Sequence, residues 1–268
     1  MEDGKIRITD DTLGETDSFC VIFDTKWDSF DWKNRKENKM QKLNVLYEDN
    51  HVIVVEKIVN VPSQGDKTGD VDMLSIIKDY LKEKYNKPGN VYLGLVHRLD
   101  RPVGGVMVFA KTSKAASRLS EQVRVKEFEK KYLVVVNGKI EPKKGEFEDY
   151  LLKNEKKNMS KVVTEGTKNA KYANLEYEVL KYNEEINLSV VTVHLHTGRH
   201  HQIRVQFSSR DHSIYGDQKY GGRGHGKQIA LWAYSLSFIH PVTKERMEFK
   251  LFPEINGTWK ILEGIKEI

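Results

Sequence analysis

LVHRLDRPVGGVMVFAK, residues 95–111, sets a charged loop between two apolar runs that are typical of buried strands. The polar side chains of this loop are His97, Arg98, Asp100 and Arg101. Two arginines so close to Asp100 favour its ionised form and also supply guanidinium groups for phosphates. The paired glycines at 104–105 allow the backbone to turn sharply or to approach a ligand closely. The loop is therefore a candidate functional site, although an Arg–Asp ion pair that merely pins a loop has the same residue types.

A second polar cluster, HLHTGRHHQIRVQF at residues 194–207, joins a predicted strand to a predicted helix. Thr197-Gly198 suits the turn that opens a helix, and we expect the helix to start near Arg199. Arg199 would then lie in the first turn, where free backbone N–H groups attract anions. The stretch IYGDQKYGGRGHGK that follows predicts a mobile loop with glycines and bases. Together these segments could grip a nucleic-acid backbone.

The histidines of this cluster offer an alternative interpretation as a metal site, because alternate strand positions put two imidazoles on one face. They are His194, His196, His200 and His201. No carboxylate follows until Asp211, and two arginines lie within the cluster, where their charge disfavours a divalent cation. We therefore predict no metal, and interpret His194 and His196 as half-buried sheet residues.

The rest of the chain predicts an α+β fold in which strands dominate. Apolar residues at helical spacing predict one helix with Met73, Ile76, Ile77, Tyr80 and Leu81 on its inner face, and another from about 113 to 125. Strands are predicted within 43–57 and at 91–96, 106–110, 132–136, 175–182, 188–196, 229–238 and 247–252, with a hairpin or loop at 141–167. Because strands and helices do not alternate regularly, this order predicts a large mixed or antiparallel sheet.

Composition and charge favour a phosphate-rich partner. Of the net charge of +5, residues 1–39 contribute −3 through ten acids and seven bases, so the remainder carries +8. The single cysteine, Cys20, excludes an intrachain disulfide and suits a reducing cytoplasm. No apolar stretch reaches the roughly 20 residues of a membrane helix. We place a domain boundary near residue 40. The arm before it is a poorly ordered tail, a strand added to the sheet, or the product of an upstream start codon.

Four segments together resemble the RluA-type pseudouridine synthases. HRLDRPVGGVMVFAK is similar to their HRLDRxTSGxxxxAK signature, and TGRHHQIRVQFSSRDHSIYGDQKYGG is similar to TGRxHQIRxHxxxxGxPIxGDxxYG. EFEKKYLVVVNG resembles the segment that supplies their active-site tyrosine, and VLYEDNHVIVVEK resembles their opening hairpin. Order and spacing agree from about residue 43 to 253. The departures are Val103-Gly104 for Thr-Ser, Gln206 for a histidine, and EKIVNVPSQ for EKPxGxxxH.

The resemblance implies a fold and a site. The implied pseudouridine synthase fold has a large mixed, mostly antiparallel sheet with a few flanking helices and a central active-site cleft, here within residues 40–268. Asp100 matches the essential aspartate, Tyr132 the tyrosine that packs against the target uracil, and Arg204 the arginine that pairs with the aspartate. We expect RNA contacts from His97, Arg98, Arg101, Arg199, His201 and Gln202. Residues 1–39 are too short and too acidic for the S4 RNA-binding domain that many relatives carry.

The implied activity is isomerisation of uridine to pseudouridine in structured RNA, either ribosomal large-subunit RNA or tRNA. The target base has to leave the helix stack before Asp100 can reach it. Asp100 is then a nucleophile at the anomeric carbon or at the uracil ring, or a general base in a glycal route. Since no redox step or high-energy group transfer occurs, we predict that no cofactor or metal is needed. We also predict a cytoplasmic monomer that binds RNA and no membrane. Two other classes stay open: a non-catalytic RNA-binding protein and a metal-dependent hydrolase built on the histidines.

Overall fold

The computed structural model describes the chain at residues 18–21, 29–33, 40–221 and 227–265, with side chains described from Leu43 onward. In these described residues, thirteen strands form one sheet with the order β2-β3-β4-β6-β12-β7-β11-β10-β8-β9; β13 pairs with β12 and β1, and β5 pairs with β6. The elements in chain order are β1 (Ser18–Val21), β2 (Ser29–Lys33), β3 (Met40–Glu48), β4 (Val52–Lys57), α1 (Met73–Lys84), β5 (Gly94–Leu95), β6 (Gly104–Ala110), α2 (Ser113–Val125), β7 (Glu129–Asn137), β8 (Lys144–Asn154), β9 (Met159–Val163), β10 (Lys171–Asn183), β11 (Leu188–Leu195), α3 (Gln202–Ser208), β12 (Leu231–Ile239), β13 (Arg246–Lys250) and the 3₁₀ helix η1 (Gly257–Leu262).

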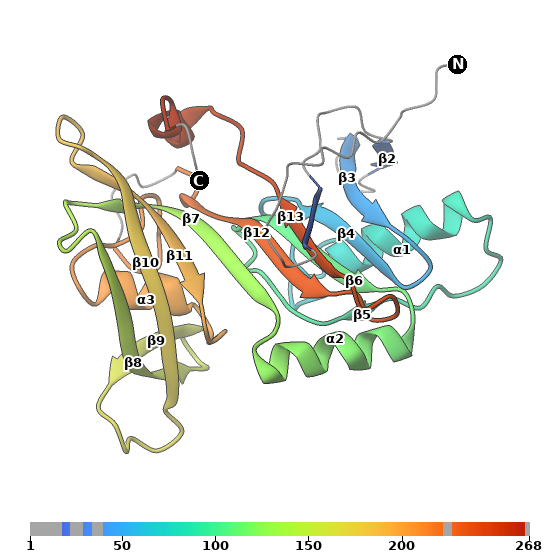
Figure 1. The fold of residues 1–268 in the computed structure, drawn as a ribbon, viewed down its shortest axis with the longest axis horizontal. Coiled ribbons are helices and arrows are strands. Elements are labelled where there is room, and N and C mark those ends of the chain that lie inside the picture. Colours follow the sequence, from blue (N-terminus) through green and yellow to red (C-terminus); the bar gives the residue numbers. More distant parts are fainter. Residues whose placement is uncertain (1–17, 22–28, 34–39, 222–226, 266–268) are drawn as a thin grey trace.

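The sheet is mixed and mostly antiparallel, as the sequence predicted. Within the described strands, β6–β12 and β1–β13 pair in parallel, and every other pairing is antiparallel. β7 and β12 run through the middle of the molecule, with β8 to β11 and α3 on one side and β3, β4, β6, α1 and α2 on the other (Figure 1). The fold class predicted from the sequence is confirmed.

Each face of the sheet is covered by different helices, because alternate strand residues point to opposite faces. In β6, Met107 and Phe109 join a core cluster with α1 and α3, whereas Val106 and Val108 join a cluster with α2. The short helix η1 covers the other half of the α2 face. At roughly 1.5–3 kcal/mol for each large apolar side chain removed from water, both faces contribute to the stability of the sheet. The face covered by α1 and α3 is called the inner face below, and the opposite face the outer face.

Both long helices lie where their apolar spacing predicted them. The five predicted inner residues of α1 are all buried, and the Asp72 carboxylate accepts a hydrogen bond from the Ser75 N–H as the N-cap. Helix α2 spans the predicted residues, with Thr112 as its cap and Leu119 buried. These elements were predictable because the period of a helix is a local property of the backbone.

One predicted strand is much shorter in the structure, and one predicted hairpin or loop is confirmed as a hairpin. The strand expected at 91–96 is only Gly94–Leu95, which pairs briefly with the far end of β6 before the chain leaves the sheet. The predicted hairpin or loop at 141–167 is a long hairpin, β8 and β9. In the N-terminal arm, the described residues form β1 and β2, which pair with β13 and β3. The rest of the arm lies outside the described residues.

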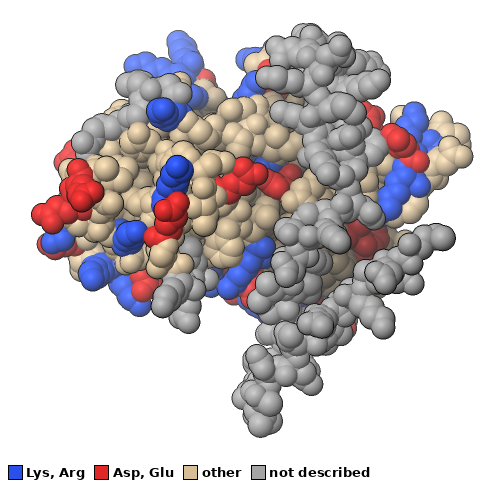
Figure 2. Space-filling view, turned by 90° about the horizontal axis from the view of Figure 1, so that it is seen from above, with Lys and Arg blue, Asp and Glu red and all other residues tan. Residues whose placement is uncertain are grey.

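None of the described helices is long and apolar enough to cross a membrane. On the face shown in Figure 2, Lys and Arg side chains lie in several separate groups among Asp and Glu, with a broad uncharged area between them. The positive excess of the chain is therefore dispersed on this face rather than gathered into one continuous patch.

Candidate active site

Asp100 lies on the loop between β5 and β6, over the inner face of the sheet. Its neighbours Leu99 and Val103 are buried in the core cluster of that face. The Ser63 hydroxyl donates to the Leu99 carbonyl at 2.8 Å and accepts from the Leu99 N–H at 3.2 Å, and the Val103 N–H donates to the Asp100 carbonyl at 2.9 Å. The backbone on both sides of Asp100 is thus fixed, while its side chain stays 30% exposed.

A buried lysine holds the same loop from below. Lys57 ends β4 and is fully buried, and its Nζ donates to the carbonyls of Arg101 at 2.9 Å, Val103 at 2.7 Å and Ile58 at 3.1 Å. Burial lowers the pKa of Lys57 to about 7, although the negative charge of Asp100 acts to raise it. This role of Lys57 was not predicted from the sequence, although a lysine at the end of the apolar run VIVVEK was a visible signal.

The paired glycines of the loop serve the sheet rather than a ligand. Gly105 has a φ of +123°, and a Cβ there would lie 2.1 Å from the Ala233 carbonyl oxygen. A Cβ at Gly104 would lie 2.3 Å from the ring of Trp232. Both glycines permit the close parallel contact of β6 with β12. This contact brings the end of the Asp100 loop next to the central strands.

Arg204 joins Asp100 to a second, fully buried carboxylate. It lies on α3 and is 4% exposed. Its Nε and Nη2 donate to Asp217 Oδ2 and Oδ1 at 2.8 and 2.6 Å, and its Nη1 donates to Asp100 Oδ2 at 3.3 Å. Burial opposes the charge of this guanidinium, but the carboxylates of Asp217 and Asp100 outweigh it and raise the pKa of Arg204. Arg204 is therefore a fixed cation beside Asp100, in the position that the resemblance implied.

His201 forms the other polar wall of the site. Its Nε2 lies 3.5 Å from Asp100 Oδ2, and its Nδ1 lies 2.9 Å from the Tyr220 hydroxyl. Burial lowers the pKa of His201 to about 3, so the imidazole is neutral near pH 7. The positive charge next to Asp100 comes from Arg204 rather than from this histidine.

Tyr132 lies on the central strand β7, with its side chain on the inner face of the sheet. It is buried and shares the inner-face core with Val134. Burial, and then the negative charge of Asp100, raise the pKa of Tyr132 well above its usual value. Its phenol therefore stays protonated over the whole neutral range, close enough to Asp100 to respond to its charge.

The motif arginines beside Asp100 do not form its ion pair. Arg101 turns away to donate to Asp70 Oδ2 at 2.6 Å and to the Asn60 carbonyl at 3.1 Å, and Arg98 is exposed. We expected both arginines to keep Asp100 ionised. This is wrong for Arg101, because its guanidinium forms an ion pair with Asp70 in the loop before α1. Arg204 supplies that charge instead.

Arg199 lies ahead of the helix rather than in its first turn. Helix α3 begins at Gln202, because His201 before it takes a left-handed φ of 53°. The Arg199 guanidinium is exposed and donates through Nε to the Tyr172 carbonyl at 2.7 Å. Contacts of Arg98, Arg101 and Arg199 with RNA stay predictions.

Two further residues predicted to bind RNA make protein contacts. His97 accepts a hydrogen bond from the Val108 N–H at 3.2 Å and packs against Phe128, on the outer face. Gln202 is 3% exposed; it accepts from the Thr197 hydroxyl at 2.8 Å and donates to the Asn174 carbonyl at 3.0 Å. RNA contact by His97 and Gln202 stays a prediction, and the observed partners give both residues a positioning role.

The segment expected to be a mobile loop supplies two residues that the sequence analysis missed. Asp217 binds Arg204 and also accepts from the N–H groups of Lys219 and Tyr220 at 2.9 and 3.2 Å. The hydroxyl of Tyr220 contacts His201 and accepts from the Ser160 N–H at 2.7 Å. Its described part, residues 214–221, consists of turns and an isolated bridge at Ile214, as expected of a loop, and its mobility stays a prediction; residues 222–226 lie outside the described residues. The GDQKYG stretch within the second family motif was the sequence signal for Asp217 and Tyr220.

Comparison with known proteins identifies similar chains. The profile of a family described as RNA pseudouridylate synthase matches residues 51–209. An uncharacterized RNA pseudouridine synthase of Aquifex aeolicus is 34% identical, over 78% of this chain and 69% of that protein. Ribosomal large subunit pseudouridine synthase C of Haemophilus influenzae is 30% identical, over 76% of this chain and 63% of that protein. The tRNA pseudouridine synthase C of Haemophilus influenzae is also 30% identical, over 76% of this chain and 90% of that protein.

The fold also has a solved counterpart. The structure of human RNA pseudouridylate synthase domain containing 4 superposes with a TM-score of 0.66 at 23% identity, over 79% of this chain and 89% of that one. Several of the curated relatives are longer, and the chain spans about two thirds of their length. The family profile includes Asp100, Tyr132 and Arg204, whereas Asp217 and Tyr220 lie beyond its last matched residue.

Proposed function

This chain belongs to the RNA pseudouridylate synthase family, and from that premise we propose that it converts uridine to pseudouridine at specific positions in structured RNA, with Asp100 as the catalytic carboxylate. The observation that carries the proposal is the linked arrangement of Asp100, Arg204 and the buried Asp217. It presents one partly exposed carboxylate, backed by a fixed cation, on a loop that Lys57 and Ser63 hold rigid.

The chemistry breaks the bond between ribose C1′ and uracil N1 and forms a bond between C1′ and C5. The C5 proton is then lost, and N1 gains a proton. A base inside a helix stack hides these atoms, so the target uridine has to be extruded first. Asp100, which is 30% exposed, is accessible to an extruded nucleotide, whereas Asp217 is fully buried. This difference in exposure supports the proposed chemical role of Asp100 and a role for Asp217 in holding Arg204.

The contacts of Asp100 favour one of its two oxygens for the reaction. Arg204 and His201 both approach Oδ2, so Oδ1 is the oxygen that can meet the substrate. As a nucleophile, Asp100 would attack the anomeric carbon or the uracil ring; as a general base, it would act in a glycal route. All three routes need the carboxylate to be aimed, which Arg204 does.

Tyr132 is proposed to pack on the extruded uracil. Because its pKa is raised, the phenol cannot act as a phenolate base near neutral pH, but it can donate a hydrogen bond or orient the ring. Its position on a buried central strand gives the base a rigid support. Action as a cytoplasmic monomer without a cofactor stays a prediction from the sequence.

The substrate class is structured RNA, and both ribosomal large-subunit RNA and tRNA remain candidates. Relatives named for each of these RNAs are equally similar, at 30% identity. Mapping pseudouridine in cellular RNA with and without this protein would identify the RNA and the position. Every uridine that loses its modification when the protein is removed, and regains it when the protein is restored, is a direct substrate candidate.

The decisive test of Asp100 is a substitution that keeps its shape. Asp100→Asn preserves size and removes the charge, so we expect pseudouridine formation to fall to background while RNA binding and the unfolding transition stay close to those of the wild type. Asp211→Asn, the same change at an exposed site, is the matched control. Sustained turnover by purified Asp100→Asn would refute the assignment.

A further inference from the structure

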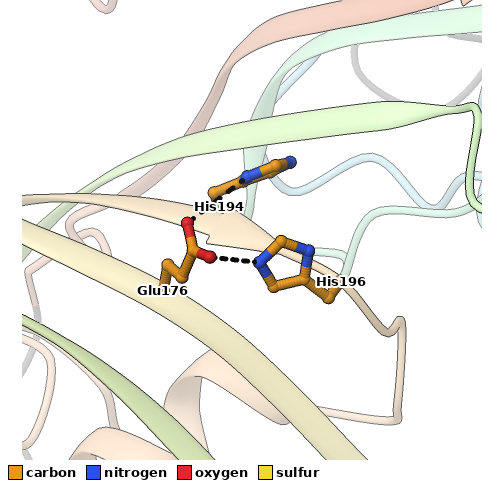
Figure 3. Close-up of side chains that lie close together, drawn as sticks. All are labelled: Glu176, His194 and His196. Carbon is orange, nitrogen blue, oxygen red and sulfur yellow. Dashed lines mark ion pairs between the residues drawn. The ribbon is translucent and has the colours of Figure 1, made fainter.

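Glu176, His194 and His196 meet on the outer face of the sheet, away from Asp100. Glu176 Oε1 lies 3.0 Å from His196 Nε2, and Glu176 Oε2 lies 3.9 Å from His194 Nδ1. The two imidazole rings have their centroids 4.5 Å apart. Figure 3 shows the carboxylate between the two rings, with one oxygen toward each. Each residue offers one ligand atom, and these atoms all lie within 4.8 Å of one another.

The register of two neighbouring strands creates this cluster. Glu176 of β10 lies directly opposite His194 of β11. Val193, the neighbour of His194, pairs with Tyr132 and packs in the inner-face core, so His194 points to the outer face. His196 is the next residue on that face, just beyond the end of β11. A carboxylate that is remote in the sequence therefore completes a pair of histidines.

We propose that Glu176, His194 and His196 bind a divalent transition metal ion of the zinc class. Two imidazoles and one carboxylate are ligands that Zn²⁺ accepts, with water in the open position. With metal–ligand bonds of about 2.1 Å, tetrahedral ligands lie about 3.4 Å apart. The observed separations of 3.0 and 3.9 Å involve different oxygens of Glu176, and the three ligand atoms lie within 4.8 Å of one another, so the side chains would draw closer together around an ion.

The charges around the cluster permit a cation. The arginines that argued against a metal in the sequence point elsewhere: Arg199 donates to the Tyr172 carbonyl, and Arg204 binds Asp217 on the inner side. On the strand beside β11, Lys131 pairs with His194 in register, while Glu129 binds Arg246 at 2.7 Å. Glu176 therefore brings a negative charge to the two imidazoles, the ammonium group of Lys131 opposes it from the next strand, and the guanidinium groups that the sequence placed near them are bound to other partners.

Such an ion would have a structural role and would take no part in the isomerisation. It would join β10 to the end of β11, immediately before the turn at Thr197 that leads to α3 and Arg204. Asp100 lies over the opposite face of the sheet, so the metal would not touch the reacting atoms. The expected consequence of binding is a higher thermal midpoint, because an ion that binds only the folded chain stabilises it.

The test uses the untagged full-length chain, freed of metal with a chelator and then titrated with ZnCl₂ or NiCl₂ by calorimetry. We expect one equivalent to bind and the thermal midpoint to rise. His196→Gln and Glu176→Gln should each weaken binding by at least about tenfold. Glu178→Gln is the matched control for the carboxylate, because Glu178 lies two residues along β10 and pairs with Lys144. His51→Gln is the control for an imidazole elsewhere on the chain.

Three results would overturn the proposal. The first is no saturable binding of either ion by the wild type. The second is equal affinity in Glu176→Gln, His196→Gln and the two controls. The third is loss of binding in His200→Gln with full binding in His196→Gln, which would place the ion near His200. Circular dichroism of each variant in chelator verifies that a loss of binding is not a loss of fold.

Discussion

The two histidine pairs at residues 194–201 share a residue type and are separated by one short turn, yet their surroundings are opposite. His194 and His196 lie on the outer face, each with 29% of its side chain exposed and a carboxylate within reach. His200 and His201 stack on one another at 3.8 Å between centroids on the inner side, where His201 is buried against Asp100 and Tyr220. The role of each histidine is therefore set by the face of the sheet that it meets.

The two faces also differ in how replaceable their contacts are: buried contacts on the inner side have no substitute, whereas water can replace those on the outer face. On the inner side, Arg204 and Asp217 are buried and paired, and buried His201 contacts Asp100 and Tyr220, so the loss of a partner leaves a buried group uncompensated. On the outer face, water can replace a lost partner at little cost. Substitutions on the inner side should therefore have large effects on activity and stability, and those on the outer face small ones.

Asp217→Asn should have the largest effect. It removes the charge that compensates buried Arg204, which costs about 3 kcal/mol or more of the free energy of unfolding. We expect turnover to fall as well, because Arg204 loses the partner that fixes its direction. Denaturant unfolding and pseudouridine formation measure the two effects. Asp211→Asn, an exposed control, should change neither; similar behaviour of the two variants would show that the Asp217 contact is dispensable.

Arg204→Lys tests whether geometry matters beyond charge. A lysine keeps the positive charge but cannot bind Asp217 through two nitrogens and also reach Asp100. A misplaced catalytic group costs on the order of a hundredfold in kcat, and we expect a loss of that size with RNA affinity retained. Arg210→Lys, which disrupts a similar paired contact with Asp149 outside the site, should keep most of the activity. Wild-type kcat in Arg204→Lys would contradict the proposed aiming of Asp100.

The lowered pKa of His201 predicts that the folded protein loses stability in acid. Its burial outweighs the attraction of Asp100 and lowers its pKa from 6.5 to about 3 in the folded state, while Arg204, His200 and Lys219 lower it further. Below pH 6.5 this imidazole binds a proton in the unfolded chain but not in the folded chain. Its contribution to the free energy of unfolding is therefore complete above pH 6.5 and is lost as the pH falls toward 3. By pH 5 this loss amounts to about 2 kcal/mol.

The measurement is the free energy of unfolding between pH 7 and pH 5 in wild type and His201→Gln. The variant should show a shallower decline, because it has no proton to take up at this position. Ser209→Ala, a non-titrating exposed change next to the end of the same helix, should keep the slope of the wild type. Parallel curves for wild type and His201→Gln would show that the imidazole is protonated equally in both states.

Changes on the outer face should have the smallest effect on the reaction. In chelator, His196→Gln and Glu176→Gln should form pseudouridine within about twofold of the wild type, because exposed substitutions away from a site change stability by about 0.5 kcal/mol or less. Single-turnover assays with a fixed RNA would measure this. A fall comparable to that of Arg204→Lys would mean that the outer face is coupled to the position of α3.

The elements that follow a local period were predictable from the sequence. The apolar spacing of α1 predicted its five buried residues, and the alternation in residues 188–196 predicted which side chains of β11 face the core. The motifs also identified Asp100, Tyr132 and Arg204 as one set through resemblance. The structure brings Arg204 into contact with Asp100 and places Tyr132 in the field of its charge.

What the sequence alone determined is therefore the long helices, most of the strands and the residue types that the site contains. Tertiary structure alone decided the partners: Arg204 on Asp217, Lys57 under the Asp100 loop, Arg101 on Asp70, and Glu176 between His194 and His196. The physical reason is that a period arises from the backbone within one element, whereas a partner arises from which strands pair, in which register and on which face. No spacing along the chain contains that information.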